Sequence, residues 1–97
     1  MQITVNILYT GKNGSAKAFA EEMVSSGLVE RIRAEAGNER YEYFFPMEDS
    51  ESVLLIDCWK NQEAIDIHHK SEMMADFAAL RKKYGLKMQV KRYTELA

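Results

Sequence analysis

The sequence predicts a single α+β domain whose elements follow the order β-α-β-β-α-β. Three segments alternate apolar and polar residues with the period of a strand, and a fourth is apolar almost throughout. Between them lie segments whose apolar residues recur with the period of a helix. A chain of 97 residues holds one hydrophobic core, so we expect residues 1–97 to form one domain.

Residues 2–10 form the first predicted strand. One face carries Ile3, Val5, Ile7 and Tyr9, and the other carries Thr4, Asn6 and Leu8. A helical stripe follows from Ala16 to Ile32, with Asn13 or Ser15 as the predicted cap. We expect a kink or a break at Ser25-Ser26-Gly27, because an interior glycine costs about 1 kcal/mol relative to alanine.

Residues 40–47 and 53–59 are the next two predicted strands, joined by a polar turn. The first has Tyr41, Tyr43 and Phe45 on one face. The second is apolar at nearly every position, which is typical of a strand buried on both faces. Since helices would cover only one face of this sheet, we expect a second copy of the chain to cover the other.

Two helices and a last strand complete the order. Asn61 can cap a short helix, and Ser71 can cap a second one, which ends at Gly85. Residues 86–93 alternate again as a strand. This order is the ferredoxin-like, split βαβ arrangement with an antiparallel sheet.

Composition limits the function classes. A net charge of −2 and a pI near 5.7 give no basic surface for nucleic acid. No apolar run reaches the roughly 20 residues that span a bilayer, and the first residues do not read as a signal peptide. We therefore expect a cytoplasmic protein that binds neither nucleic acid nor membrane. Cys58 is the only cysteine, which excludes an internal disulfide.

Asp57 is the first candidate for chemistry, because an ionised carboxylate in the most apolar segment needs a partner. It is either a structural hydrogen-bonding group or a pocket acid that orients a histidine or binds substrate. Trp59 lies two residues further and so on the same strand face. It is either a core residue or an aromatic wall of a pocket.

His68 is the second candidate, and it shares a helix face with Ala64 and Ile65. We expect it to point inward, either as a hydrogen-bonded core residue or as a general base, since its ordinary pKa is about 6.5. His68 and His69 project about 100° apart on a helix, so they are poorly placed to coordinate the same metal ion. We predict no metal site.

A group of aromatic and methionine residues could line a pocket or simply fill the core: Tyr41, Tyr43, Phe45, Met73, Met74 and Phe77. Asn6 is an amide on an otherwise apolar strand and could hold a substrate oxygen or satisfy the backbone. With Trp59 and Asn6, the predicted substrate-binding residues are Tyr41, Tyr43, Met73 and Phe77.

The segments Asp57-Cys58-Trp59, Asn61-Gln62-Glu63-Ala64-Ile65 and His68-His69-Lys70-Ser71 together resemble the antibiotic biosynthesis monooxygenase (ABM) domain family. The resemblance implies a homodimer in which two sheets pack face to face as a dimeric α/β barrel, with a cavity between each sheet and its helices. It also implies oxygenation of quinols or polyphenols without metal, flavin or another cofactor. Asp57, Trp59 and His68 match the family motif, and Asn6 sits where several members have a polar residue.

The chain departs from the family pattern at two places. Met73 stands where members have a second histidine, and Glu72 replaces a proline. This chain therefore lacks the second histidine that a two-histidine mechanism requires. Haem-degrading relatives use a tryptophan and a histidine where this chain has His68 and Ala78, so we expect no haem breakdown.

Three hypotheses follow. The first is an ABM-type monooxygenase acting on a small hydroxyaromatic or quinol molecule, with His68 as base or orienter and Asp57 as its partner. The second is an isomerase or lyase of a small carbonyl compound. The third is a non-catalytic dimeric protein that binds a small molecule.

Overall fold

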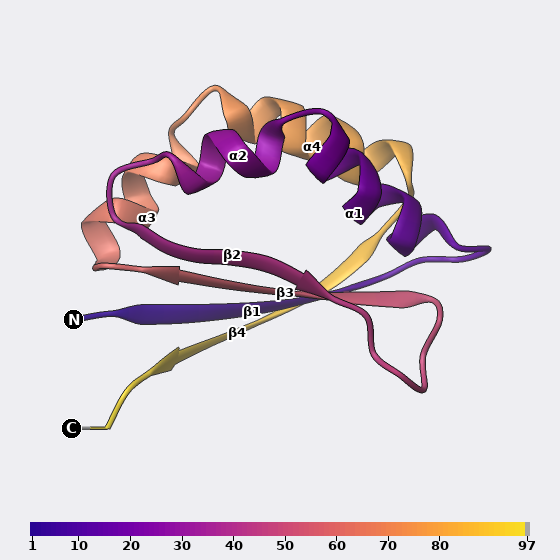
Figure 1. Cartoon of the computed structure of the whole chain (residues 1–97), viewed down its shortest axis with the longest axis horizontal. Coiled ribbons are helices and arrows are strands. Elements are labelled where there is room, and N and C mark those ends of the chain that lie inside the picture. Colours follow the sequence, from indigo (N-terminus) through magenta and orange to yellow (C-terminus); the bar gives the residue numbers. More distant parts are fainter. Residues whose placement is uncertain (97) are drawn as a thin grey trace.

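The computed structural model describes residues 1–96, which form a four-stranded antiparallel sheet with four helices on one of its faces (Figure 1). The strands are β1 (Ile3–Thr10), β2 (Asn38–Phe44), β3 (Ser52–Trp59) and β4 (Lys87–Thr94). The helices are α1 (Ser15–Ser25), α2 (Leu28–Arg33), α3 (Gln62–His69) and α4 (Met73–Lys83). The strand order β2-β3-β1-β4 confirms the predicted ferredoxin-like fold.

The register of the sheet divides the residues between two faces. β1 lies between β3 and β4, and Val5 pairs with Asp57 while Tyr9 pairs with Val53. The inner face, toward the helices, carries Tyr9, Val53, Leu55 and Trp59, all of them at most 1% exposed. These side chains pack against apolar residues of the helices, so the core of the chain lies between the sheet and the helices.

The predicted interruption of the first helical segment is a complete break. Gly27 adopts a φ of +84°, and the chain continues from it as the separate helix α2. Two of the predicted caps are wrong. Gly14 occupies the cap position of α1 and Glu72 that of α4, and neither helix has a side-chain cap. Asn61 does cap α3, since its side chain accepts a hydrogen bond of 2.9 Å from the Ala64 amide.

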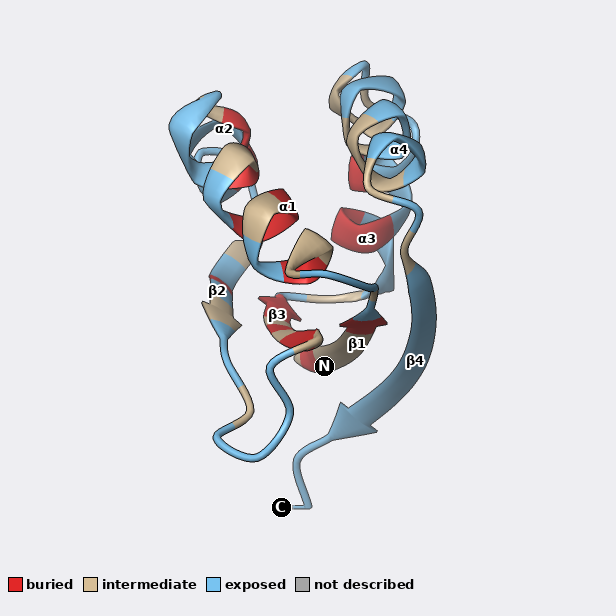
Figure 2. Ribbon diagram, turned by 90° about the vertical axis from the view of Figure 1, so that its right-hand side faces the viewer, coloured by how far each residue is buried: buried red, intermediate tan, exposed pale blue. Residues whose placement is uncertain are grey.

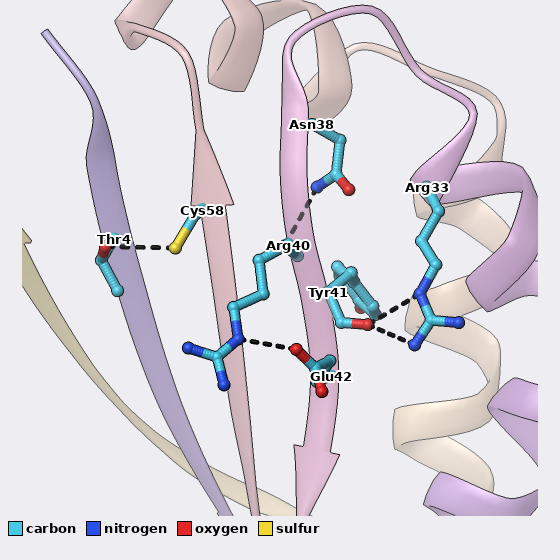
Figure 3. Close-up of polar contacts among 7 residues, drawn as sticks. All are labelled: Thr4, Arg33, Asn38, Arg40, Tyr41, Glu42 and Cys58. Atoms are coloured by element: carbon cyan, nitrogen blue, oxygen red, sulfur yellow. Dashed lines mark hydrogen bonds and ion pairs between the residues drawn. The ribbon is translucent and has the colours of Figure 1, made fainter.

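The turn between α2 and β2 packs tightly against α3. Gly37 has a φ of +87°, and a Cβ atom built on it would lie 2.6 Å from Cβ of Ala64. Its carbonyl accepts a hydrogen bond of 2.8 Å from the amide of Lys60. From α2, the guanidinium of Arg33 donates to the carbonyl of Tyr41 at 3.0 and 2.7 Å (Figure 3). These contacts hold the turn at one end of the sheet.

The outer face of the sheet carries no helix (Figure 2). Leu54 and Ile56 of β3 are only half-buried there, and β4 is exposed along its whole length. Cys58 lies on this face, 3.2 Å from the hydroxyl of Thr4, and Arg40 pairs with Glu42 further toward the edge (Figure 3). Within one chain, β3 is therefore well buried on its inner face and incompletely buried on its outer face.

None of the helices in residues 1–96 has both the length and the apolar character needed to cross a membrane.

Replacing Gly37 by alanine should lower the free energy of unfolding by about 2–5 kcal/mol. A positive φ costs an L-residue about 1–2 kcal/mol, and overpacking against Ala64 typically adds about 1–3 kcal/mol. Gly14→Ala is the matched control, because Gly14 has a φ of +79° and nothing within 4 Å of the added Cβ. Urea denaturation measures both losses. Equal losses would show that the contact with Ala64 does not contribute to the loss of stability.

Candidate functional site

A cavity of about 160 Å³ lies between the inner face of the sheet and the helices. Its walls are mostly apolar. The strands contribute Val5, Ile7, Leu55, Met88 and Val90, and the helices contribute Ile32, Ile65, Met74 and Phe77. A small number of polar groups in such a largely apolar cavity is typical of small-molecule sites. Those groups belong to Tyr9, Tyr41, Asp57, Trp59, His68 and His69.

Asp57 is a buried acid in the wall of this cavity, 6% exposed. Its Oδ2 accepts a hydrogen bond of 3.2 Å from the indole nitrogen of Trp59. Its Oδ1 is buried and has no hydrogen-bond partner among residues 1–96. Burial raises the pKa of Asp57 to about 6, and the Trp59 hydrogen bond opposes this rise. The carboxyl group therefore changes its charge near neutral pH.

His68 is held by a carboxylate from another part of the chain. Its Nδ1 lies 2.6 Å from Oε2 of Glu35, which belongs to the turn between α2 and β2. Both side chains are largely buried, and the His68 ring stacks on Trp59 with 4.6 Å between ring centroids. Because a carboxylate accepts hydrogen bonds, Nδ1 carries the hydrogen and Nε2 keeps its lone pair.

The charge of His68 follows from two opposed effects. Burial lowers its pKa below the ordinary value, and the neighbouring carboxylate of Glu35 raises it by less. The lowered pKa favours the uncharged imidazole at neutral pH. A neutral imidazole in a cavity wall, with one nitrogen fixed by a carboxylate, is a competent proton acceptor.

The antibiotic biosynthesis monooxygenase family model matches residues 2–80. The chain belongs to this family. Residues 57–71, which carry the resemblance seen in the sequence, lie inside the matched range, so the family assignment is confirmed. In this ABM-family chain, the motif residues Asp57, Trp59 and His68 come together in the wall of one cavity.

Several solved structures share the ABM fold of this chain. PA3566 from Pseudomonas aeruginosa is 26% identical, with a TM-score of 0.82 over 99% of this chain and 95% of that one. Rv0793 from Mycobacterium tuberculosis is 16% identical, with a TM-score of 0.83 over 100% and 97%. SnoaB, a cofactor-independent oxygenase from Streptomyces nogalater, is 12% identical, with a TM-score of 0.81 over 99% and 94%. No curated protein matches the chain in sequence.

Glu35 is the site residue that the sequence did not predict, and the expected pairing of His68 with Asp57 is wrong. Asp57 bonds to Trp59 on its own strand, whereas Glu35 reaches His68 because the turn at Gly37 packs against α3. One signal was present in the sequence. An acidic residue just after the end of a helix faces the negative end of the helix dipole, which is unfavourable without a partner.

Asn6 does not reach the cavity. It lies on the outer face of the sheet, where it lines a shallow hollow with Leu54 and Lys91. Successive strand residues point to opposite faces, so Asn6 faces away from its neighbours Val5 and Ile7. Its Oδ1 is buried without a hydrogen-bond partner in the described part of the chain. This position does not fit the predicted role of Asn6 in holding an oxygen of a substrate bound in this cavity.

Two further predicted residues lie beside the cavity rather than in its wall. Tyr43 lines a separate groove between α1 and β2, with its hydroxyl 3.4 Å from that of Tyr41. Met73 packs on the core, while Met74 lines the cavity, because neighbouring helix residues project about 100° apart. Tyr41 and Phe77 line the cavity, and their role in binding a substrate stays a prediction.

The residues described contain no group of three or more His, Cys, Asp or Glu side chains that could hold a metal ion. The sequence prediction against a metal site stays a prediction.

The titration of Asp57 should be visible in the pH dependence of stability. The folded-state pKa of about 6 lies above the ordinary 3.8, so the folded protein holds the proton of Asp57 more tightly than the unfolded chain does. The resulting stabilisation of the fold is complete below about pH 4 and is lost as the pH rises to about 6. The loss should be about 3 kcal/mol, since one pKa unit corresponds to about 1.4 kcal/mol.

Asp57→Asn removes this titration without changing the size of the side chain. Urea denaturation from pH 4 to pH 8 measures the free energy of unfolding of both proteins. Over this range, the wild type should lose about 3 kcal/mol relative to Asp57→Asn. A difference that stays constant over this range would contradict a raised pKa for Asp57.

Proposed function

We propose that this protein is a cofactor-independent monooxygenase of a small hydroxyaromatic or quinol-type molecule, which binds in the cavity between sheet and helices. The observation that carries the proposal is the contact between His68 and Glu35 in the wall of an apolar cavity. Family membership supports it, as does the fold shared with SnoaB, which is itself a cofactor-independent oxygenase.

The first proposed step is removal of a proton from a hydroxyl of the bound substrate. Nε2 of His68 accepts the proton, since Nδ1 is already bonded to Glu35. The Glu35 carboxylate then stabilises the imidazolium that forms, as buried carboxylates do for catalytic histidines. Glu35 acts through His68, so it is a positioning residue.

The second proposed step is reaction of the resulting phenolate with O₂. The deprotonated ring is electron-rich and can pass an electron to O₂, and radical recombination then forms a carbon–oxygen bond. Loss of water from the resulting ring hydroperoxide breaks the O–O bond and leaves one oxygen atom on the ring as a carbonyl. For hydroquinone the overall balance is C₆H₆O₂ + O₂ → C₆H₄O₃ + H₂O, in which the substrate supplies all the electrons. The largely apolar cavity strengthens the electrostatic contacts of the anion and limits side reactions with water.

We also propose that the outer face of the sheet is covered by a second copy of the chain, as in the dimeric α/β barrel that the family resemblance implies. Leu54 and Ile56 are half-buried on this face, and β4 is exposed along its whole length. An opposing copy would complete the burial of these aliphatic residues.

Oxygen uptake with hydroquinone tests the proposed reaction. His68→Ala should lower the enzyme-dependent rate at least about 10²-fold, the usual contribution of a general base. With ¹⁸O₂, one labelled oxygen atom should appear in the hydroxyquinone product. Uptake above the spontaneous rate with hydrogen peroxide as the only reduced product, or an unlabelled quinone, would contradict monooxygenation.

Glu35→Gln should move the acid limb of the pH–rate profile to lower pH. The Glu35 carboxylate raises the pKa of His68, so an amide in its place lets His68 stay neutral in more acidic solution. Glu30→Gln, an exposed substitution on α2, is the control and should leave the profile in place. An unchanged profile for Glu35→Gln would remove Glu35 from the mechanism.

Ile56→Asp should convert the dimer into a monomer, because it places a charge at the centre of the outer sheet face. Ile67→Asp introduces the same charge at a helix position that is already 59% exposed and should leave the dimer intact. Analytical ultracentrifugation gives the mass of each form. A monomeric wild type, or an Ile56→Asp variant that remains dimeric, would contradict the proposed interface.

A further inference from the structure

α4 is the only helix in residues 1–96 that buries no residue (Figure 2). Each of the other three helices buries at least three residues. The apolar side chains of α4 that pack against the core are only partly buried: Met73, Phe77 and Leu80. The proposed interface between two copies lies on the opposite face of the sheet, so a second copy there would leave α4 uncovered. Of the helices in this part of the chain, α4 is therefore the least firmly packed.

This loosely packed helix forms part of the cavity wall, through Met74 and Phe77. β4 also lines the cavity and is exposed along its whole length, but its backbone pairs with β1 from Lys87 to Thr94. The backbone hydrogen bonds of a helix stay within it, so α4 is held to its neighbours mainly by side chains. Segments with few buried contacts open at a lower free energy than the rest of a domain. α4 is thus the wall of the cavity that moves most easily.

The C-terminal end of α4 is firmly held. The amides of Gly85 and Leu86 donate to carbonyls of the last helical turn at 3.1 and 3.2 Å, which are the paired bonds of a Schellman motif. From α1, the carboxylate of Glu22 accepts a hydrogen bond of 2.8 Å from the side chain of Lys83 and a second one from the Tyr84 hydroxyl. These contacts fix this end of the helix to α1.

The N-terminal end of α4 is held much less firmly. No side chain caps it, and the nearby Ser71 hydroxyl donates to the carbonyl of His68 at 2.7 Å instead. The ion pair at this end joins Arg31 of α2 to Asp76 at 3.5 Å, and these side chains are 54% and 60% exposed. An exposed ion pair shifts an equilibrium by only about two- to fivefold. The two ends of α4 therefore differ in how easily they detach.

We propose that α4 is a lid over the cavity, hinged at its C-terminal end near Gly85 and latched at its N-terminal end by the Arg31–Asp76 ion pair. When the latch opens, Met74 and Phe77 move away from the sheet, which enlarges the cavity and connects it with solvent. The closed volume of about 160 Å³ is then not the upper limit on what the cavity admits. This inference concerns access to the cavity and holds whether or not a bound molecule is oxygenated there.

Quenching of Trp59 fluorescence by acrylamide tests the latch. Trp59 is the only tryptophan of the chain, lines the cavity and is 1% exposed, so a solute reaches its ring only when a wall of the cavity moves. Asp76→Asn should raise the quenching constant about two- to fivefold. Glu48→Gln removes the same charge from an exposed position in the turn between β2 and β3, and it should leave the quenching constant unchanged. Equal quenching of the wild type and Asp76→Asn would overturn the latch.

Arg31→Gln separates the latch from the intrinsic stability of the helix. Asp76 lies in the first turn of α4, where its charge also interacts favourably with the helix dipole. Arg31→Gln breaks the same ion pair from α2 and leaves the sequence of α4 intact. It should raise the quenching constant by about the same factor as Asp76→Asn, and the double variant should show no further increase. An increase in Asp76→Asn alone would assign the effect to the dipole and overturn the latch.

Amide hydrogen exchange, followed by NMR, identifies the element that moves. A helix as short as α4 is marginal in water, so its internal hydrogen bonds break when it leaves the core. The amides of residues 77–80 should therefore exchange at least about tenfold faster than those of residues 19–22, which occupy the corresponding turn of α1. Equal protection of the two helices would overturn the lid, because α4 would then open only with the whole domain.

These measurements use neither a substrate nor oxygen, so their outcomes are separable from those of the proposed reaction. If α4 opens as described but no labelled oxygen enters the product, the monooxygenase proposal fails and the lid stands. If hydroquinone is oxygenated while α4 is as well protected as α1, the lid fails and the reaction stands.

Discussion

In the four-stranded sheet, successive side chains of each strand point to opposite faces, and the helices cover only one of those faces. This constraint assigns each strand residue to one of two environments. Val5, Tyr9 and Asp57 face the helices and line a cavity, whereas Asn6 and Ile56 face away from it. The fold thus places the groups proposed for chemistry on the inner face and the groups proposed for assembly on the outer face.

Burial has the same physical consequence for four ionisable groups around the cavity. It raises the pKa of Asp57, of Tyr9 and of Tyr41, and it lowers the pKa of His68. In each case the uncharged form is favoured, because the cavity solvates charge poorly. The phenols stay protonated as hydrogen-bonding groups, and the imidazole stays neutral as a proton acceptor. These effects agree with the proposed substrate, a neutral aromatic molecule, and with the proposed transfer of its proton to His68.

The contact between His68 and Glu35 shows how this arrangement is maintained. Glu35 lies in a turn, and its position depends on the tight packing of Gly37 against α3 and on the bonds from Arg33 to the Tyr41 carbonyl. A buried carboxylate and a buried imidazole each need a hydrogen-bond partner. Here Glu35 and His68 are hydrogen-bonded to each other. A turn remote from the motif residues in sequence therefore fixes which nitrogen of His68 is free.

The sequence by itself determined the order of the elements and which strand residues share a face, because both follow from local periodicity. It also indicated the break at Gly27 and the inward position of His68. The family motif could be recognised in the sequence because Asp57, Trp59 and His68 lie within one short stretch of chain. Capping was less predictable, since Ser15 and Ser71 can make alternative local hydrogen bonds.

Only the tertiary structure decided the partners across the fold. Glu35 and His68 are thirty-three residues apart, and periodicity carries no information about which turn will lie against which helix. The choice of Met74 over Met73 in the cavity wall depends on the rotation of α4 about its axis. The unpaired atoms of Asp57 and Tyr9 became visible only when every neighbouring side chain was in place. Hydrogen-bond satisfaction is a property of three-dimensional packing, which local sequence patterns do not encode.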